Sequence, residues 1–146
     1  MSEQRPLRVL LVEDHPADVA LTRKAFARIA TANALDVVPD GIEAMRFLRR
    51  QGPYTTAERP DIILLDLNMP RMTGCEVLEE IRQDDGLKAI PVIVLTTSGA
   101  VQDVREAYEL GANAYLTKPV GFDAFLNVVE AVEAFWFGLT LLPTPP

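Results

Sequence analysis

Several side chains that could carry chemistry stand at the ends of short apolar segments. Glu13 and Asp14 directly follow the run LRVLLV at residues 7–12, and Asp66 ends the run DIILLD at residues 61–66. A carboxylate sealed away from water inside a protein is strongly unfavourable unless it is paired. We therefore expect Asp66 to emerge from the core at the last position of its segment, where other groups compensate its charge.

Two further reactive groups occupy equivalent positions later in the chain. Thr96 ends the apolar segment at residues 91–96, and Lys118 directly follows the segment at residues 114–117. The first supplies a hydroxyl and the second a positive charge. Hydrogen-bond donors and cations of this kind stabilise the oxygens of a phosphoryl group during its transfer.

The segments that must position these groups alternate between strand and helix. Apolar strands are expected at residues 7–12, 35–38, 61–66, 91–96 and 114–117. Helices are expected at about 16–31, after the capping residues Asp40 and Thr73, from 101 to a stop at Gly111, and at about 121–137. Strands without polar alternation, each followed by a helix, indicate a parallel sheet with helices on both faces. We expect a single domain over residues 1–146 with its core at about 7–137.

The acids, the hydroxyl and the amine are then expected to meet at one edge of the sheet. In an open parallel α/β sheet, functional groups gather beyond the carboxyl ends of the strands. Carboxylates that lie close together repel one another, and a hard cation such as Mg²⁺ relieves this repulsion. Asp66, from the middle of the edge, is the best-placed nucleophile.

The four motifs that contain these residues resemble those of a known family. LLVEDHPAD, LLDLNMPRMTG, VIVLTTS and AYLTKP, in that order, resemble the receiver domains of bacterial two-component response regulators. The resemblance covers residues 7 to about 137. It implies a doubly wound (βα)5 fold of the flavodoxin and CheY type, a three-layer sandwich whose five parallel strands have the order 2-1-3-4-5.

The resemblance also implies a role for each acid. Asp66 would accept a phosphoryl group from a sensor histidine kinase, or from an intermediate phosphotransfer protein. Glu13, Asp14, Asp66 and the main-chain carbonyl of Asn68 would bind Mg²⁺, for which Mn²⁺ or Ca²⁺ could substitute. The protein would then catalyse only its own phosphorylation and dephosphorylation, and would not be an enzyme in the usual sense.

Residues on the fourth and fifth strands would respond to the phosphoryl group. The resemblance implies that Lys118 pairs with the phosphate and that Thr96 is the switch hydroxyl. Tyr115 would be the switch aromatic, facing inward or outward according to the state. The Lys118–Pro119 peptide bond would be cis.

The overall composition limits the partners. The net charge of −7 argues against binding to duplex DNA or to an anionic membrane, because both normally need a basic face. The single cysteine, Cys75, excludes an intrachain disulfide and suits a reducing cytoplasm. No apolar run reaches the length of about 18 residues that a membrane span needs, and no signal peptide is evident.

The last predicted helix carries more apolar residues than one buried face requires. No DNA-binding module follows it, so we expect output through protein contacts or a phosphorelay. The surplus apolar residues, together with the tail at residues 138–146, predict a homodimer; the alternative is that the tail folds back over the helix. The segments NMPRMTGCEVL and VIVLTTS and the terminal FW pair resemble stand-alone regulators that partner bacterial phytochrome kinases.

Other interpretations of the same residues remain open at this point. A phosphohydrolase with an aspartyl-phosphate intermediate would use a similar set of groups, and a receiver-shaped binding module would never take phosphate. His15 is most simply a surface histidine, although it could tune access of metal or partner. Cys75 is most simply a packing residue, although its place near a helix start could make its thiol acidic.

Overall fold

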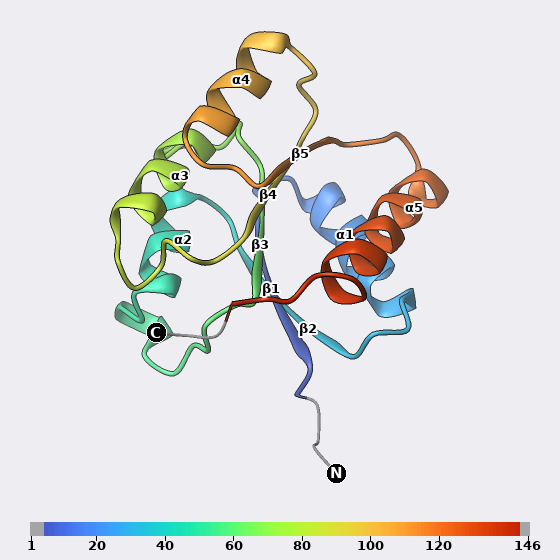
Figure 1. Ribbon diagram of the computed structural model, residues 1–146, viewed down its shortest axis with the longest axis horizontal. Helices are drawn as coiled ribbons and strands as arrows, with labels where there is room; N and C mark the ends of the chain where they lie inside the picture. Colours follow the sequence, from blue (N-terminus) through green and yellow to red (C-terminus); the bar gives the residue numbers. More distant parts are fainter. Residues whose placement is uncertain (1–4, 144–146) are drawn as a thin grey trace.

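Five strands alternate with five helices along residues 5–143, the part of the chain that the computed structural model describes (Figure 1). The strands are β1 (Leu7–Val12), β2 (Asn33–Val38), β3 (Ile62–Leu65), β4 (Val92–Thr96) and β5 (Ala114–Thr117). The helices are α1 (Pro16–Arg28), α2 (Gly41–Leu48), α3 (Gly74–Gln83), α4 (Val101–Glu109) and α5 (Phe122–Val132). A short 3₁₀ helix, η1 (Gly52–Tyr54), precedes β3, and a π-helical turn, η2 (Glu133–Phe137), continues α5. Residues 144–146 of the predicted dimerisation tail lie outside the described residues.

The strands form one parallel sheet in the order β2-β1-β3-β4-β5, which confirms the predicted fold class and strand order. Its register decides which side chains meet at the carboxyl edge. Val12 at the end of β1 pairs with Leu65 at the end of β3, so the residues that follow them, Glu13 and Asp66, begin side by side. The backbone N–H of Asp66 donates to the carbonyl of Val12 at 3.1 Å and holds this alignment.

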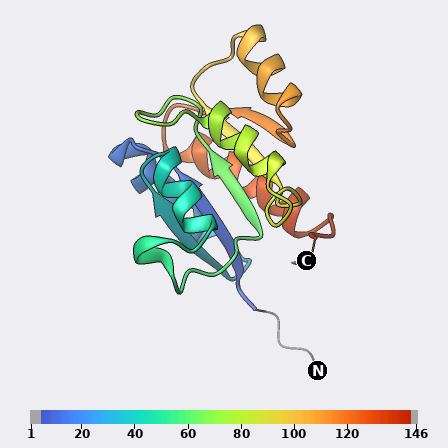
Figure 2. The ribbon, with the colours of Figure 1, turned by 90° about the vertical axis from the view of Figure 1, so that its left-hand side faces the viewer.

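Helices cover both faces of the sheet (Figures 1 and 2). Helices α1 and α5 pack on one face, where Phe26 and Phe125 are among the largest fully buried side chains. Helices α2, α3 and α4 pack on the other face, where the core includes Phe47 and Leu78. Because the central strands β3 and β4 are buried on both faces, they are apolar at nearly every position, which is the pattern the sequence displays.

Local capping explains where several elements begin and end. Asp40 accepts from the backbone N–H of Glu43, and Thr73 and Glu76 form a complete capping box, as their spacing predicts. Helix α1 ends at Arg28, three residues before the predicted end at residue 31. The side-chain amide of Asn33 donates to the carbonyls of Phe26 and Thr31, so the chain leaves the helix and enters β2 two residues earlier than predicted.

The start of α3 lies unusually close to the backbone that carries Asp66. A Cβ atom on Gly74 would lie 2.5 Å from the carbonyl oxygen of Asp66 and 2.7 Å from the Cα of Leu67. No residue with a side chain fits at this distance without displacing backbone. Gly74 therefore lets the helix support the turn that presents Asp66.

Within residues 5–143, no helix combines the length and the apolar composition needed to span a bilayer.

Replacing Gly74 by alanine tests this close contact. We expect Gly74→Ala to lower the free energy of unfolding by about 1–3 kcal/mol, because the added methyl group overpacks against backbone. Urea denaturation followed by circular dichroism measures the change. Gly86→Ala is the matched control, since a Cβ there meets only the Asp84 side chain at 3.4 Å, and it should change stability by less than about 1 kcal/mol. Equal stability of the two variants would contradict the role assigned to Gly74.

Candidate functional site

The structure brings the predicted acids, hydroxyl and amine together at the carboxyl edge of the sheet. Glu13 and Asp14 follow β1, Asp66 follows β3, Thr96 ends β4 and Lys118 follows β5. We call Glu13, Asp14 and Asp66 the acidic cluster. Each of its members leaves the sheet at the point where a strand turns toward the next helix, so side chains from separate strands converge on one place.

Asp66 is almost fully buried, with 3 % of its surface exposed, yet both of its carboxylate oxygens have partners. Its Oδ1 accepts from the Thr96 hydroxyl at 2.9 Å and from the Asn68 backbone N–H at 3.2 Å. Its Oδ2 accepts from the Lys118 ammonium at 3.2 Å. These contacts compensate the carboxylate that the apolar segment carries, as its position in the sequence led us to expect.

Lys118 is the central cation of the site. Its side chain is only 5 % exposed, and its Nζ lies 2.5 Å from Glu13 Oε1, 2.9 Å from Asp18 Oδ2 and 3.2 Å from Asp66 Oδ2. Burial by itself would lower the pKa of Lys118, but the three carboxylates raise it well above its ordinary value. The ammonium therefore stays charged throughout the physiological pH range.

Asp18 is a site residue that sequence reasoning missed. It is the last letter of the motif LLVEDHPAD and lies in the first turn of α1, where its carboxylate reaches Lys118. The only sequence signal was its place four residues after Asp14, which fits a solvated helix start equally well. Only the fold shows that α1 begins beside the end of β5.

Within the acidic cluster, burial and contacts with neighbouring charges shift the pKa values of the two most buried acids, Glu13 and Asp66, in opposite directions. Burial is the main cause that raises the pKa of Glu13, and its contact with Asp66 adds to the effect, against the opposing influence of Lys118. Burial also acts to raise the pKa of Asp66, but its contacts with Glu13, Lys118 and Thr96 outweigh this and lower it. Asp66 therefore holds its negative charge more firmly than Glu13 does.

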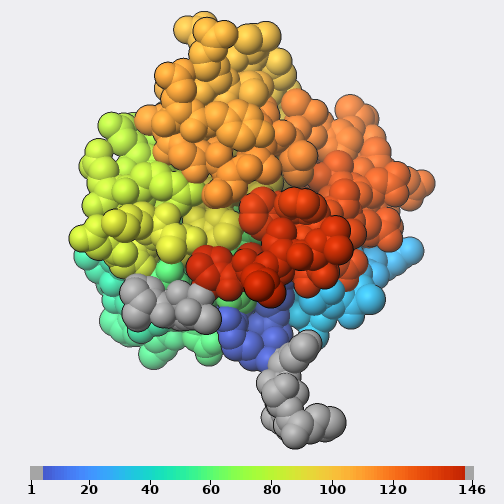
Figure 3. Space-filling model, in the orientation of Figure 1, coloured from blue at the N-terminus to red at the C-terminus, as the bar shows by residue number. Residues whose placement is uncertain are grey.

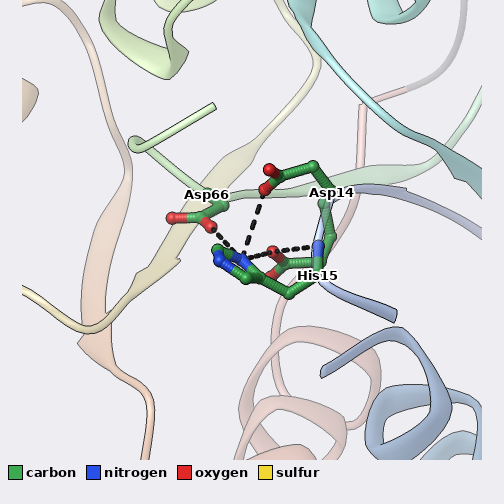
Figure 4. A group of neighbouring side chains, drawn as sticks. Asp14, His15 and Asp66 are labelled. Atoms are coloured by element: carbon green, nitrogen blue, oxygen red, sulfur yellow. Dashed lines mark hydrogen bonds and ion pairs between the residues drawn. The ribbon is translucent and has the colours of Figure 1, made fainter. Parts of the chain in front are cut away.

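His15 lies against all three acids of the cluster, and Figure 4 shows it beside Asp14 and Asp66. Its Nδ1 is 3.1 Å from Glu13 Oε2, 3.2 Å from Asp14 Oδ1 and 3.9 Å from Asp66 Oδ2, while 58 % of the side chain is exposed. The hydrogen bond with Glu13, followed by the charge of Asp14, raises the pKa of His15. The sequence placed His15 beside the acids but did not show that its ring faces them.

The geometry suits a divalent cation. Ligand atoms of the acidic cluster and of His15 all lie within 4.8 Å of one another. The Oδ1 atom of Asp14 is buried and forms no hydrogen bond within the described residues. A buried carboxylate oxygen without a hydrogen bond is costly, and a bound cation removes that cost. The donor set is therefore consistent with the metal that the sequence predicted.

The two predicted switch residues both point toward the interior in this structure. The Thr96 hydroxyl already donates to Asp66, and the Tyr115 hydroxyl donates to the main-chain carbonyl of Ser98 at 2.9 Å. The backbone N–H of Tyr115 donates to the Tyr108 hydroxyl. Sequence reasoning assigned no switch contact to Ser98 or Tyr108, because the first contact depends on the segment between β4 and α4 and the second on the approach of α4 to β5.

The predicted cis peptide bond at Lys118–Pro119 was wrong. Residues 5–143 contain no cis peptide bond. The trans form is the ordinary state even before proline, and Lys118 reaches the acids without the rarer isomer. Its backbone N–H donates to the carbonyl of Thr96 at 2.7 Å, which fixes the strand end that carries the ammonium.

Cys75 lies near the site, but its pKa is raised, whereas an activated thiol has a lowered pKa. It follows Gly74 in the first turn of α3, where a helix N-terminus would favour the thiolate. Burial, followed by the charge of Glu106 and its hydrogen bond, instead raises the pKa of Cys75 to about 11. The packing interpretation of this residue is therefore favoured over the acidic thiol.

Together, the fold and the site define a doubly wound α/β protein that presents a buried aspartate, an acidic cation pocket and a lysine at one sheet edge. The family model for the response regulator receiver domain matches residues 9–130. The chain belongs to this family, which confirms the resemblance seen in its four motifs and speaks against the phosphohydrolase interpretation.

Similar proteins agree with this assignment along almost the whole chain. Response regulator Rcp1 from Synechocystis is 44 % identical over 138 residues, which cover 94 % of this chain and 94 % of that protein. The Mn²⁺-bound crystal structure of Rcp1 superposes with a TM-score of 0.88 and covers 95 % of this chain and 100 % of that one. The crystal structure of the phosphorylated cyanobacterial phytochrome response regulator RcpA is 42 % identical in sequence and has a TM-score of 0.91. The match covers 96 % of this chain and 100 % of that one.

The reactivity of Cys75 tests the electrostatics of this region. With a pKa of about 11 instead of the ordinary 9.0, the folded protein has about 100-fold less thiolate at neutral pH. We expect iodoacetamide to alkylate Cys75 correspondingly slowly at pH 8, and the rate to rise about tenfold per pH unit up to pH 10. Mass spectrometry follows the reaction, and the urea-unfolded protein provides the reference rate. A folded rate equal to the unfolded one at pH 8 is incompatible with the buried, acid-flanked thiol.

Proposed function

We propose that Asp66 accepts the phosphoryl group that controls this response regulator. The observation that carries the proposal is the position of Asp66 between a buried ammonium, a hydroxyl and the acidic cluster. Its lowered pKa keeps the carboxylate ionised at neutral pH, so an oxygen lone pair is available to attack phosphorus. The donor would be the phosphohistidine of a sensor kinase or of an intermediate phosphotransfer protein.

The chain supplies positioning and charge neutralisation, which are the main requirements of phosphoryl transfer. Lys118 lies within hydrogen-bond distance of Asp66 and stays protonated, so it can pair with the incoming phosphoryl oxygens. The Thr96 hydroxyl and the Asn68 backbone N–H already point at the other carboxylate oxygen. These donors are in place before the reaction and need little reorganisation during it.

The proposal includes a divalent cation held by the acidic cluster and by the main-chain carbonyl of Asn68. When bound, Mg²⁺ would neutralise the carboxylates and the phosphoryl oxygens and so lower the electrostatic barrier to transfer. A Mn²⁺-bound form of the relative Rcp1 is known, which supports a divalent ion as part of the proposal. Mg²⁺ is the proposed physiological ion, with Mn²⁺ or Ca²⁺ as substitutes.

Signalling would follow from rearrangement around Thr96 and Tyr115. A phosphoryl group adds charge and acceptor oxygens beside Asp66, which favours the state in which Thr96 and Lys118 bind those oxygens. Tyr115 would adjust its rotamer with Thr96, because the Tyr115 hydroxyl donates to the carbonyl of Ser98, which lies two residues after Thr96 in the same segment. The surface formed by α4 and β5 would then present the phosphorylated state to a protein partner.

A bacterial phytochrome kinase is the proposed source of the phosphoryl group. The relative RcpA is described as a phytochrome response regulator, and its similarity extends over almost the whole of this chain. With a net charge of −7, the chain is better suited to a protein partner than to a nucleic acid. The proposed location is the cytoplasm, and the proposed catalysis is limited to the protein's own phosphorylation and dephosphorylation.

Phosphate labelling tests the assignment of Asp66. We expect wild-type protein to incorporate phosphate from radiolabelled acetyl phosphate when Mg²⁺ is present, and EDTA to abolish the reaction. Asp66→Asn should reduce labelling by at least about 100-fold, because the variant lacks the nucleophilic oxygen. Asp85→Asn changes the same residue type at a position whose side chain is 95 % exposed, and should label normally. Unchanged labelling of Asp66→Asn would remove Asp66 from the role.

We also propose that the C-terminal segment forms a homodimer interface. Figure 3 shows the segment after η2 crossing the front of the molecule beside the first described residues. It passes the start of β1 and the residue before β3, at the amino-terminal ends of these strands. There it borders a cavity of about 610 Å³ together with Arg5, Leu7 and Trp136. The tail thus folds back in part, yet Phe135, Leu139 and the 98 %-exposed Leu141 remain uncovered. Exposed apolar residues grouped in this way favour association with a second copy.

A paired substitution tests the dimer. We expect wild-type protein to sediment as a dimer at micromolar concentration and Phe135→Ser/Leu141→Ser to weaken dimerisation at least about tenfold, since each side chain loses apolar burial. Val120→Ser is the matched control, because Val120 is equally exposed at 97 % but follows β5 at the opposite edge. A wild-type protein that sediments only as a monomer would contradict the dimer.

A further inference from the structure

His15 faces the acidic cluster although nothing in the proposed phosphotransfer uses it. It is the only histidine of the chain and directly follows Glu13 and Asp14. It occupies the N-cap position of α1, and Pro16 restricts the backbone that follows it. Three consecutive side chains that a strand would send to alternating sides are therefore gathered on one site by the turn between β1 and α1.

A single hydrogen bond from the His15 ring does not explain why three carboxylate oxygens lie within 3.9 Å of Nδ1. Nδ1 can share one proton with one acceptor, and that acceptor is Glu13 Oε2 at 3.1 Å. Asp14 Oδ1 lies 3.2 Å from the same nitrogen, yet it is buried without a hydrogen bond within the described residues. Asp66 Oδ2, at 3.9 Å, is beyond hydrogen-bond distance. Asp66 Oδ2 accepts from Lys118 instead, so the single proton on Nδ1 leaves Asp14 Oδ1 as the oxygen without a hydrogen bond.

The same distances match those between the ligands of one cation. Ligands bound at about 2.1 Å in an octahedron lie about 3.0 Å apart when adjacent and about 4.2 Å apart when opposite. The separations from Nδ1 to Glu13, Asp14 and Asp66 are 3.1, 3.2 and 3.9 Å. Nδ1 therefore lies at the distances from the carboxylate oxygens that are expected between ligands of one cation. Figure 4 shows the ring facing both Asp14 and Asp66.

We propose that His15 is a nitrogen ligand of the cation site and that it shifts the preference of the site from Mg²⁺ toward transition metal ions such as Mn²⁺ and Co²⁺. The proposal rests on the proposed function, because it concerns the same pocket. It adds a specificity-determining residue that the acids alone do not supply.

The physical basis is the difference between oxygen and nitrogen ligands. Mg²⁺ prefers carboxylates, carbonyls and water, and it gains little when an imidazole replaces a water. Affinity for a nitrogen-containing site rises from Mn²⁺ through Co²⁺ to Ni²⁺. A site made of carboxylates and one imidazole therefore discriminates among these ions more strongly than a site made of carboxylates alone.

Metal titration of the full chain tests the preference. Isothermal titration calorimetry would give dissociation constants for Mg²⁺ and Co²⁺ in the wild type, in His15→Ala and in Thr97→Ala, an exposed neighbour of Thr96 outside the cation pocket. In His15→Ala we expect the Co²⁺ dissociation constant to rise at least about tenfold and that of Mg²⁺ to change less than about threefold. Thr97→Ala should leave both constants unchanged.

A spectroscopic measurement identifies the ligand directly. Electron spin-echo modulation of bound Mn²⁺ should show coupling to an imidazole ¹⁴N nucleus in the wild type and lose it in His15→Ala. Absence of that coupling in the wild type overturns the proposal. Tighter Co²⁺ binding by His15→Ala also overturns it, because His15 would then compete with the metal for the carboxylates. Mg²⁺-dependent labelling of Asp66 in both proteins reports on the proposed function separately, since it does not need the imidazole.

Discussion

The structure depends on one electrostatic constraint, the crowding of carboxylates around a single buried ammonium. Glu13, Asp18 and Asp66 all lie within 3.2 Å of Lys118 Nζ, and Asp14 adds a further acid beside them. An isolated buried charge would shift its pKa and become neutral, whereas opposite charges in contact keep one another ionised. The acids thus hold Lys118 protonated, and Lys118 in turn makes it possible for the acids to stay together at the end of an apolar sheet.

The same contacts connect elements that are distant in the sequence. Lys118 joins the end of β5 to the end of β1, the first turn of α1 and the end of β3, and Thr96 joins β4 to β3. The negative charge of the site is not fully neutralised, however, because the ammonium contacts three carboxylates and Asp14 adds a fourth beside them. A divalent cation brings the site close to neutrality, and without one the surplus negative charge would repel a phosphoryl group. The need for metal in the proposed function therefore follows from the composition of the pocket as well as from family membership.

Much of this arrangement could be predicted from the sequence, because the responsible signals are local. Apolar runs located the strands, and capping residues such as Asp40 and Thr73 located helix starts. Positions at or directly after the strand ends identified Asp66, Thr96 and Lys118. Strand order and the roles of the site residues came from the resemblance of four motifs, since periodicity does not specify which strands are neighbours.

The features that the sequence missed all depend on tertiary contacts. Asp18 joins the site because α1 starts next to the end of β5, and Tyr115 binds Ser98 because the segment between β4 and α4 passes close to β5. The orientation of the His15 ring depends on the turn after β1, and the raised pKa of Cys75 depends on Glu106 from another helix. For Asp18, Tyr115 and Cys75 the partner lies on a separate element, so the contact arises only when the fold brings the two elements together.

The inward positions of Thr96 and Tyr115 bear on how phosphorylation would act. A ligand shifts a two-state equilibrium only as far as it binds one state better than the other. In this structure the Thr96 hydroxyl already donates to Asp66, so a phosphoryl group would redirect an existing hydrogen bond and would not have to draw the hydroxyl in from solvent. Most of the differential binding energy would then come from Lys118 and the cation, which face the newly added oxygens. In the proposed mechanism the selectivity of the cation pocket would become part of the switch, because the bound ion would determine how strongly the phosphorylated state is favoured.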